Sequence, residues 1–429
     1  MKKDNSLPPA TPQGIRAYRF YPMFLMAFFR TYFYAIYGLA LPNYLIFDQE
    51  WSPSLVGTVS SITSITYILG PFISQYTTKL LGMKRTLILA SSISYVLLLV
   101  PVFVANPIIV ILARSLEGIA NGHFWPNAIN IITCWEKNHI EVNKTDYLKR
   151  FNLTWNFGLI FGFLSGYFFV FFVKSDFIAI IYSLVFATLM IPSAFLLESS
   201  TQFSIYDNKP VIYDRRFPTI GSSKILEETS IPYKSENDPD SLKNVPIIMA
   251  FGGIILFSSS KSTLKFMFPY LLIQNDLESY WVYALTFFIQ VMQITGLNLI
   301  SKFKKKRYGY LTGVVYIATC GIIMITLRNI YFVSFLMILG GLMYGLVQGV
   351  AQRIVIDYNK HHNSTKYSAV NEIAIGIGFG FPPIIAGLIY EVNMLWVFIF
   401  LATELSIIAI ILFSTHFKFI KNQKTKIDS

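Results

Sequence analysis

The chain has 429 residues, of which 54% are hydrophobic and only 14% are charged, and its formal net charge is +12. Soluble domains carry about 25% charged residues, so this composition excludes an ordinary soluble protein. The positive charge does not indicate nucleic-acid binding, because Lys and Arg stand in short clusters between apolar runs and form no basic face interleaved with aromatic residues. The two cysteines, Cys134 and Cys320, exclude a disulfide framework, and we expect neither a metal nor a cofactor.

Twelve apolar runs, separated by shorter polar segments, follow one another along the sequence. They cover residues 20–46, 54–78, 84–104, 107–134, 148–173, 176–197, 246–273, 279–300, 308–327, 330–356, 367–390 and 393–416. Each run is long enough to cross about 30 Å of hydrocarbon as a helix that rises about 1.5 Å per residue. A backbone in lipid must satisfy its own hydrogen bonds, and the runs lack the alternation of a β-barrel. We therefore predict an all-α membrane protein with 12 transmembrane helices.

Polar segments divide these runs into two groups of six. Residues 198–245 are charged and contain several prolines, which indicates a linker rather than a folded domain. We therefore predict one six-helix bundle over 20–197 and a second over 246–416. A polar tail is expected at 1–19 and a basic tail at 417–429. The first apolar run is too long for the hydrophobic part of a signal peptide, so we expect the first tail to be retained.

Basic residues lie almost entirely on one side of the predicted membrane. The loops of the other side hold only Lys174 and Arg328, beside several Asp and Glu residues. By the positive-inside rule, the basic side, which includes both termini, is predicted to be cytoplasmic. We expect a multi-pass, monomeric protein embedded in the lipid bilayer of the cell (plasma) membrane.

Glycine patterns in the fourth and fifth runs are those of a known family. The fourth run has an Arg followed by Gly four and eight positions later, and the fifth has three Gly at four-residue spacing. These residues are Arg114, Gly118, Gly122, Gly158, Gly162 and Gly166. With two similar halves and a central loop, the chain resembles the major facilitator superfamily over nearly its whole length. The resemblance implies transport by alternating access between two bundles, and we assign the glycines to close helix packing.

The loop between the second and third runs departs from the pattern of that family. The family usually has an acidic and then a basic residue before a glycine and two further basic residues, whereas this chain has Lys79 and Leu80 in the first two places. The carboxylate that the usual charge relay needs is therefore missing. Gly82, Lys84 and Arg85 remain and predict a tight, basic cytoplasmic turn.

Charged residues inside the apolar runs are the candidates for function, because a charge at the centre of a bilayer costs at least about 2.5–3.5 kcal/mol. These residues are Arg30, Arg114, Glu117, Lys261, Lys265, Glu372 and Glu404. We expect Arg30, Lys261 and Lys265 to bind an anionic substrate, since cations around one cavity attract carboxylate or phosphate. The other four are candidates for coupling or gating. Each charge could instead form a structural pair or extend to the membrane surface.

A resemblance to the organophosphate antiporters of the superfamily adds a detail to this site. Lys261 precedes Pro269 by eight residues, which is the place of a basic residue in the seventh span of those proteins. Their basic residue of the first span falls on Tyr34 here, and Arg30 is one helical turn away. We therefore add Tyr34 to the predicted substrate-binding residues.

The sequence predicts a secondary active transporter, either an antiporter or a symporter. The favoured substrate is a small organic anion, and the coupled species is a proton or a counter-anion. Proton-coupled efflux of drug-like or amphipathic compounds is an alternative. A non-transporting membrane scaffold or receptor is a second alternative, from another class. No nucleotide-binding loop or hydrolase motif is found, so we do not expect an enzyme.

Overall fold

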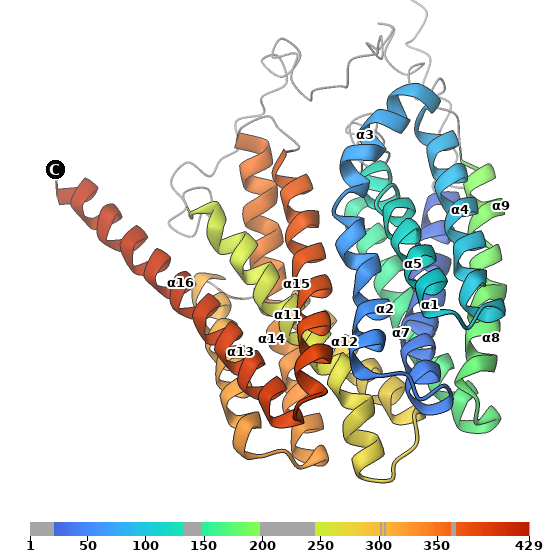
Figure 1. The fold of residues 1–429 in the computed structure, drawn as a ribbon. Coiled ribbons are helices and arrows are strands. Elements are labelled where there is room, and N and C mark those ends of the chain that lie inside the picture. Colours follow the sequence, from blue (N-terminus) through green and yellow to red (C-terminus); the bar gives the residue numbers. More distant parts are fainter. Residues whose placement is uncertain are drawn as a thin grey trace, which may run out of the picture.

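The computed structural model describes residues 21–129, 131, 147–197, 245–300, 303, 306–361 and 366–428, and every element in these residues is a helix (Figure 1). The elements of the amino-terminal half are α1 (Tyr21–Asn43), the π-helical turn η2 (Tyr44–Asp48), α2 (Pro53–Tyr67), α3 (Gly70–Leu81), α4 (Met83–Phe103), α5 (Pro107–Asn121), α7 (Tyr147–Val173), α8 (Asp176–Thr188) and α9 (Met190–Phe195). Those of the carboxy-terminal half are α11 (Ile247–Gln274), α12 (Tyr280–Leu299), α13 (Lys306–Thr326), α14 (Ile330–His361), α15 (Lys366–Tyr390) and α16 (Met394–Asp428).

The described helices agree with the predicted membrane fold. Ten segments are long and apolar enough to cross a membrane, and α2 with α3, bent by 48°, forms an eleventh candidate span. The remaining predicted span, 107–134, consists of α5, a turn at Gly122 and a further helical stretch over 124–129, beyond which most residues lie outside the described part. The predicted linker lies outside it except for Val245, and so does all of the first tail, whereas α16 continues through the segment predicted as the second tail.

A close contact between two glycines accounts for two of the breaks in these helices. A Cβ atom on Gly70, at the break between α2 and α3, would lie 2.3 Å from the Cα atom of Gly122, at the end of α5. Pro71 follows at the start of α3 and cannot donate a backbone hydrogen bond. The two helices therefore bend where they touch, and only glycine allows so close an approach.

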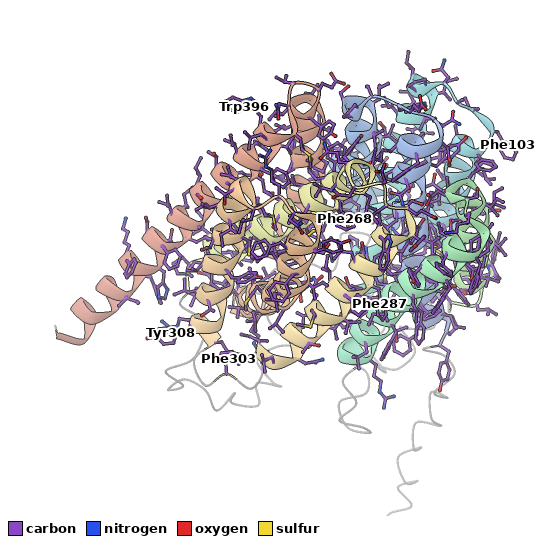
Figure 2. All side chains as sticks on the ribbon, turned by 90° about the horizontal axis from the view of Figure 1, so that it is seen from below. Phe103, Phe268, Phe287, Phe303, Tyr308 and Trp396 are labelled. Carbon is purple, nitrogen blue, oxygen red and sulfur yellow. The ribbon has the colours of Figure 1, made fainter. Side chains whose placement is uncertain are left out.

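The outer surface of the bundle is apolar, as contact with lipid requires. Phe103 is 79% exposed and Trp396 is 55% exposed, whereas Phe268 is only 3% exposed. Figure 2 views the protein along the bundle and shows Phe103 and Trp396 near its rim and Phe268 near its middle. The burial pattern is therefore that of a protein solvated by hydrocarbon, with polar groups kept inside.

Two pairs of helices join the halves, which stand side by side in Figure 1. Helix α2 packs on α15, and α7 packs on α12. We call the lower end in Figure 1 the short-loop face, because the short connections 49–52, 104–106, 174–175, 275–279, 327–329 and 391–393 lie there.

Several polar contacts cross between the halves at the short-loop face. Lys174 Nζ lies 2.5 Å from Glu278 Oε2, and both side chains are about half exposed. The Ser54 amide donates to Glu391 Oε1 at 3.3 Å, and hydrogen bonds from Ser54 lower the pKa of this exposed carboxyl group. Tyr283 Oη donates to the buried Asp176 Oδ1 at 2.9 Å. The halves are therefore in contact at this face.

Candidate functional site

A buried polar cluster connects α1 with α5 in the amino-terminal half. Arg30 Nη2 donates to Asn121 Oδ1 at 2.9 Å, and its guanidinium lies 4.4 Å from the centre of the Phe124 ring. Tyr34 Oη donates to Glu117 Oε1 at 2.6 Å, and Asn121 Nδ2 donates to the same oxygen at 2.9 Å. The cluster therefore joins two predicted substrate-binding residues, Arg30 and Tyr34, to the predicted coupling residue Glu117.

Arg114 and Glu117 form an ion pair within this cluster, as their i,i+3 spacing on α5 allows. Glu117 is fully buried, and Arg114 is 6% exposed. Arg114 Nε is a buried donor with no acceptor among the described residues. Glu117 is the one carboxylate of this cluster, which also contains the guanidinium groups of Arg30 and Arg114. Two positive charges and one negative charge leave the cluster with a net positive charge.

Glu117→Gln is expected to destabilise the protein by about 3–5 kcal/mol, because it leaves the buried Arg114 charge without its partner. The midpoint of thermal unfolding of the detergent-solubilised protein, followed by tryptophan fluorescence, measures this effect. The double variant Arg114→Met/Glu117→Met removes both charges of the pair and should recover part of the loss, because Tyr34 and Asn121 still lose their acceptor. Glu278→Gln is the matched control, because an exposed pair contributes only about 0–1 kcal/mol. A drop for Glu117→Gln no larger than that of this control would refute the assigned role.

Lys261 on α11 is held by side-chain amides of α12. Its Nζ donates to Gln290 Oε1 at 3.1 Å and to Gln293 Oε1 at 2.7 Å. Gln290 Nε2 donates in turn to Asn156 Oδ1 on α7 at 3.1 Å, and Gln293 Nε2 donates to Gln348 Oε1 on α14 at 2.6 Å. Neutral amide oxygens orient the ammonium group of Lys261 without cancelling its charge.

Lys265 lies one helical turn further along α11 and reaches the other half of the protein. A Cβ atom on Gly38 of α1 would be 3.6 Å from Lys265 Nζ, with no other atom close to it. Among the described residues, neither Lys261 nor Lys265 forms an ion pair. Two uncompensated ammonium groups thus face the region where the halves meet.

The two remaining predicted carboxylates lie in different surroundings. Glu372 on α15 accepts a hydrogen bond from Tyr67 Oη of α2 at 2.6 Å, so it joins the halves. Glu404 is partly buried on α16, and its Oε2 atom has no hydrogen-bond partner among the described residues. Helix α16 packs on α11, α13 and α15. The structure therefore places Glu372 between the halves and Glu404 on a helix within the carboxy-terminal half.

Comparison with known proteins identifies the family. The family model of the Major Facilitator Superfamily matches residues 23–211 and 250–428. This chain belongs to the Major Facilitator Superfamily. It is therefore an integral, multi-pass membrane protein of a transporter family, and the predicted fold is confirmed. No similar protein was found among the curated proteins.

The superfamily fold is also that of similar solved structures. The nucleoside transporter NupG superposes with a TM-score of 0.64 at 12% sequence identity, covering 93% of this chain and 99% of that one. A mutant of NupG gives a TM-score of 0.65 at 12% identity, with 92% and 99% coverage. At this identity the similarity concerns the arrangement of the helices.

The glycines of the superfamily pattern lie where helices touch. A Cβ on Gly118 would lie 2.1 Å from Thr66 Oγ1, and one on Gly158 would lie 2.1 Å from Thr31 Oγ1. Gly162 is similarly close to the backbone of Tyr32. These contacts support the packing role predicted for the glycines.

The loop between α3 and α4 contains the predicted tight turn. Gly82 has a φ of 78°, which favours glycine, and Lys84 and Arg85 follow in the first turn of α4.

Sequence reasoning missed the amides of this site. Asn121, Gln290 and Gln293 are buried polar residues in apolar runs, and Gln290 and Gln293 have the i,i+3 spacing of one helix face. Buried polar groups need hydrogen-bond partners, so this spacing is a signal that could have singled them out. Their partners, Arg30 and Lys261, lie on other helices of the superfamily fold, and no local pattern in the sequence connects them.

Proposed function

We propose that this protein is a secondary active transporter that carries a small organic anion by alternating access. The observation that carries this proposal is the charge of Lys261 and Lys265, neither of which forms an ion pair among the described residues, with Lys265 near the buried Arg114. An anion entering between the halves would supply the missing negative charge, and the interaction would be strong where water is scarce. NupG, by its name, transports nucleosides, whereas Lys261 and Lys265, which form no ion pair with any residue that the structure describes, favour an anion over a neutral nucleoside.

The substrate would bind between Lys261 and Lys265 of one half and Arg30 and Tyr34 of the other. Hydrogen bonds from both halves to one anion would draw them together, which is how substrate binding would promote the change of conformation. Glu117 and Glu372 are the proposed coupling residues, because each has a carboxylate that can accept a proton and that already accepts a hydrogen bond from a tyrosine. Glu404 is a further candidate for a proton carrier. The coupled species is a proton or a counter-anion.

Orientation and location follow from the distribution of charge. We place the basic side, with both termini, in the cytoplasm and the short-loop face outside the plasma membrane. The contacts at that face then make this an outward-closed conformation. We propose that the chain works as a monomer, since each half contributes to the one central site.

Efflux of amphipathic compounds is less well supported than anion transport. That alternative was based on the glycines of α7 and on Arg114. Gly158 and Gly162 pack on α1, and Arg114 pairs with Glu117, so both features have a role without an efflux function.

The test is transport by the purified protein in proteoliposomes. A panel of labelled carboxylates, organophosphates, nucleosides and lipophilic cations would be offered in counterflow, at pH 6 and at pH 8. We expect accumulation of at least one class of organic anion and of no lipophilic cation. Accumulation of nucleosides or lipophilic cations alone would overturn the anion proposal. Absence of transport and of ligand-induced thermal stabilisation would instead favour a scaffold or receptor.

A further inference from the structure

A small cavity of about 20 Å³ lies beside Lys261 and Lys265, between α11, α12 and α14. Apart from Lys261, Lys265 and Thr286, its walls are almost wholly apolar and include Phe268, Leu285, Ile289 and Met337. A space of this size holds about one water molecule. Its surface is almost wholly apolar, so Lys261 and Lys265 line it with their aliphatic stems, and their ammonium groups lie at its edge.

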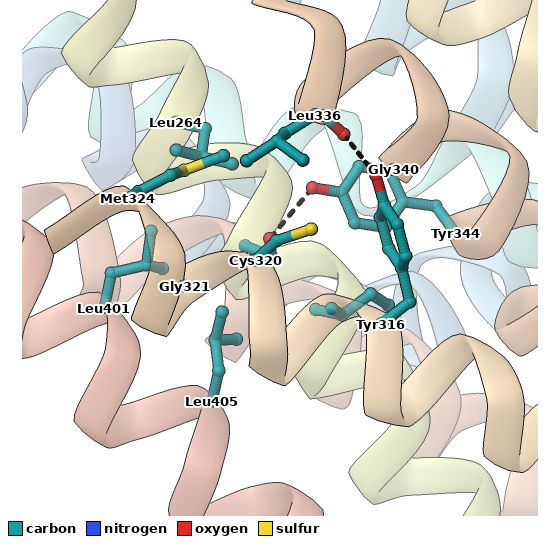
Figure 3. Close-up of a pocket in the computed structure, with 12 residues that line it drawn as sticks. Leu264, Tyr316, Cys320, Gly321, Met324, Leu336, Gly340, Tyr344, Leu401 and Leu405 are labelled. Atoms are coloured by element: carbon teal, nitrogen blue, oxygen red, sulfur yellow. Dashed lines mark hydrogen bonds between the residues drawn. The ribbon is translucent and has the colours of Figure 1, made fainter. Parts of the chain in front are cut away.

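A second cavity of about 10 Å³ lies on the other side of Tyr344, between α11, α13, α14 and α16 (Figure 3). Tyr344 lines both cavities, and its side chain is the partition between them. The walls of the second cavity are again largely apolar and include Leu264, Met324, Leu336 and Leu401. The two spaces together lead from the lysines into the interior of the carboxy-terminal half.

Among the described residues, a single hydrogen bond holds the side chain of Tyr344. Tyr344 Oη and Ser260 Oγ are 2.8 Å apart, and Ser260 directly precedes Lys261 in α11. Gly340 lies one turn before Tyr344, and the atoms nearest to a Cβ there belong to the Tyr344 side chain, at 3.5 Å. The absence of a side chain at Gly340 leaves space beside the Tyr344 side chain on the side of the second cavity, which Gly340 also lines.

We propose that these cavities form an apolar subsite for the hydrocarbon or aromatic part of the transported anion. The anionic group binds Lys261 and Lys265, and the body of the substrate displaces the Tyr344 ring and enters the second cavity. The substrate class is then a monoanion with an apolar body, such as an aromatic or branched carboxylate. A compact polyanion would place charged groups against the apolar walls, which is costly. This inference rests on the proposed function and specifies its substrate.

Binding of a homologous series of anions to the purified full-length protein tests the subsite. The probes are acetate, butyrate, hexanoate and 3-phenylpropionate, with succinate and citrate as polyanions, and the readouts are thermal stabilisation and inhibition of counterflow. We expect affinity for the monocarboxylates to rise about three- to fourfold per buried methylene. We expect succinate and citrate to bind more weakly than hexanoate.

Variants at Gly340 and Tyr344 show where the hydrocarbon chain of the ligand binds. Gly340→Val fills the space beside Tyr344 and should lower the affinity for hexanoate and 3-phenylpropionate at least about fivefold, with acetate unchanged. Tyr344→Phe removes the contact with Ser260 but keeps the ring, so it should preserve or increase the preference for long chains. Gly309→Ala is the control, because a Cβ there meets only side-chain atoms of Ile300 and Phe303.

The possible results separate this inference from the proposed function. Anion binding that depends on Lys261 but not on chain length, or an equal effect of Gly340→Val on acetate and hexanoate, would overturn the subsite and leave anion transport standing. Failure of every anion to bind or be transported would overturn the proposed function itself. Chain-length dependence that Gly340→Val abolishes and Gly309→Ala retains supports the subsite.

Discussion

Lys261→Gln is expected to lower anion transport by about 10- to 100-fold, which corresponds to the loss of a charged hydrogen bond of about 1.5–3 kcal/mol. The amino group of Lys261 is oriented by Gln290 and Gln293 and forms no ion pair among the described residues. Its charge is therefore available to the substrate. Glutamine can still form hydrogen bonds with these two amides, so the fold and the thermal stability should change little.

Initial rates of counterflow in proteoliposomes, at matched protein density, measure this effect. Lys265→Gln should lower transport as well, since Lys265 lies one turn away and faces α1. Lys418→Gln is the control for loss of a lysine, because Lys418 is exposed near the end of α16. Lys261→Arg keeps the charge but cannot reproduce the compact ammonium group, and partial activity is expected. Unchanged anion transport in Lys261→Gln would exclude Lys261 from the substrate site.

The positions of the helices could be predicted from the sequence because hydropathy is a local property. The run 148–173 corresponds to α7 (Tyr147–Val173), and the run 246–273 corresponds to α11 (Ile247–Gln274). The break between α2 and α3 has one local signal, Pro71 after Gly70, which the continuous hydropathy of the run 54–78 outweighed in the prediction. The break also depends on contact between Gly70 and Gly122, which lie far apart in the sequence and meet only in the folded bundle.

The candidate site could be predicted only in part, for the same reason. The pair Arg114 and Glu117 is readable from i,i+3 spacing on one helix. The identity of the charged residues is also readable, since each is conspicuous in an apolar run. Which of them meet is a tertiary property. The hydrogen bonds of Arg30 to Asn121 and of Lys261 to Gln293 connect different helices. The charged residues of the site could therefore be named from the sequence, but their contacts could not.

We call the contacts of α2 with α15 and of α7 with α12 the seam between the halves. A substitution in this seam is expected to have a further large effect, which concerns conformation. Gly57→Val is expected to shift the protein away from the conformation closed at the short-loop face. A Cβ atom on Gly57 of α2 would lie 2.5 Å from the carbonyl oxygen of Pro383 on α15, and one on Gly387 would lie 2.5 Å from that of Pro53. Backbone atoms on both sides cannot yield, so α2 and α15 must separate.

Cross-linking of the exposed ends of the seam measures the shift caused by Gly57→Val. Cysteines would replace Lys174 and Glu278, whose side chains meet at their charged ends, in a background where Cys134 and Cys320 are serine, and a bifunctional thiol reagent would span the shorter cysteine side chains. Removing this exposed ion pair costs only about 0–1 kcal/mol, so the reporter itself should not open the seam. Overpacking of about 1–3 kcal/mol predicts a fall in the ratio of closed to open protein of about five- to hundredfold, which the initial rate of cross-linking reports.

Transport should fall together with the cross-link, because alternating access requires closure at this face in every cycle. Gly309→Ala, which lies away from the seam, should alter neither the cross-link nor transport. Thermal stability separates the two possible causes of a loss of transport. A folded Gly57→Val protein with a low rate of cross-linking shows that closure was lost, and the anion site would still bind ligand from the opened face. An unchanged rate of cross-linking in Gly57→Val would show that these helices do not hold the seam closed.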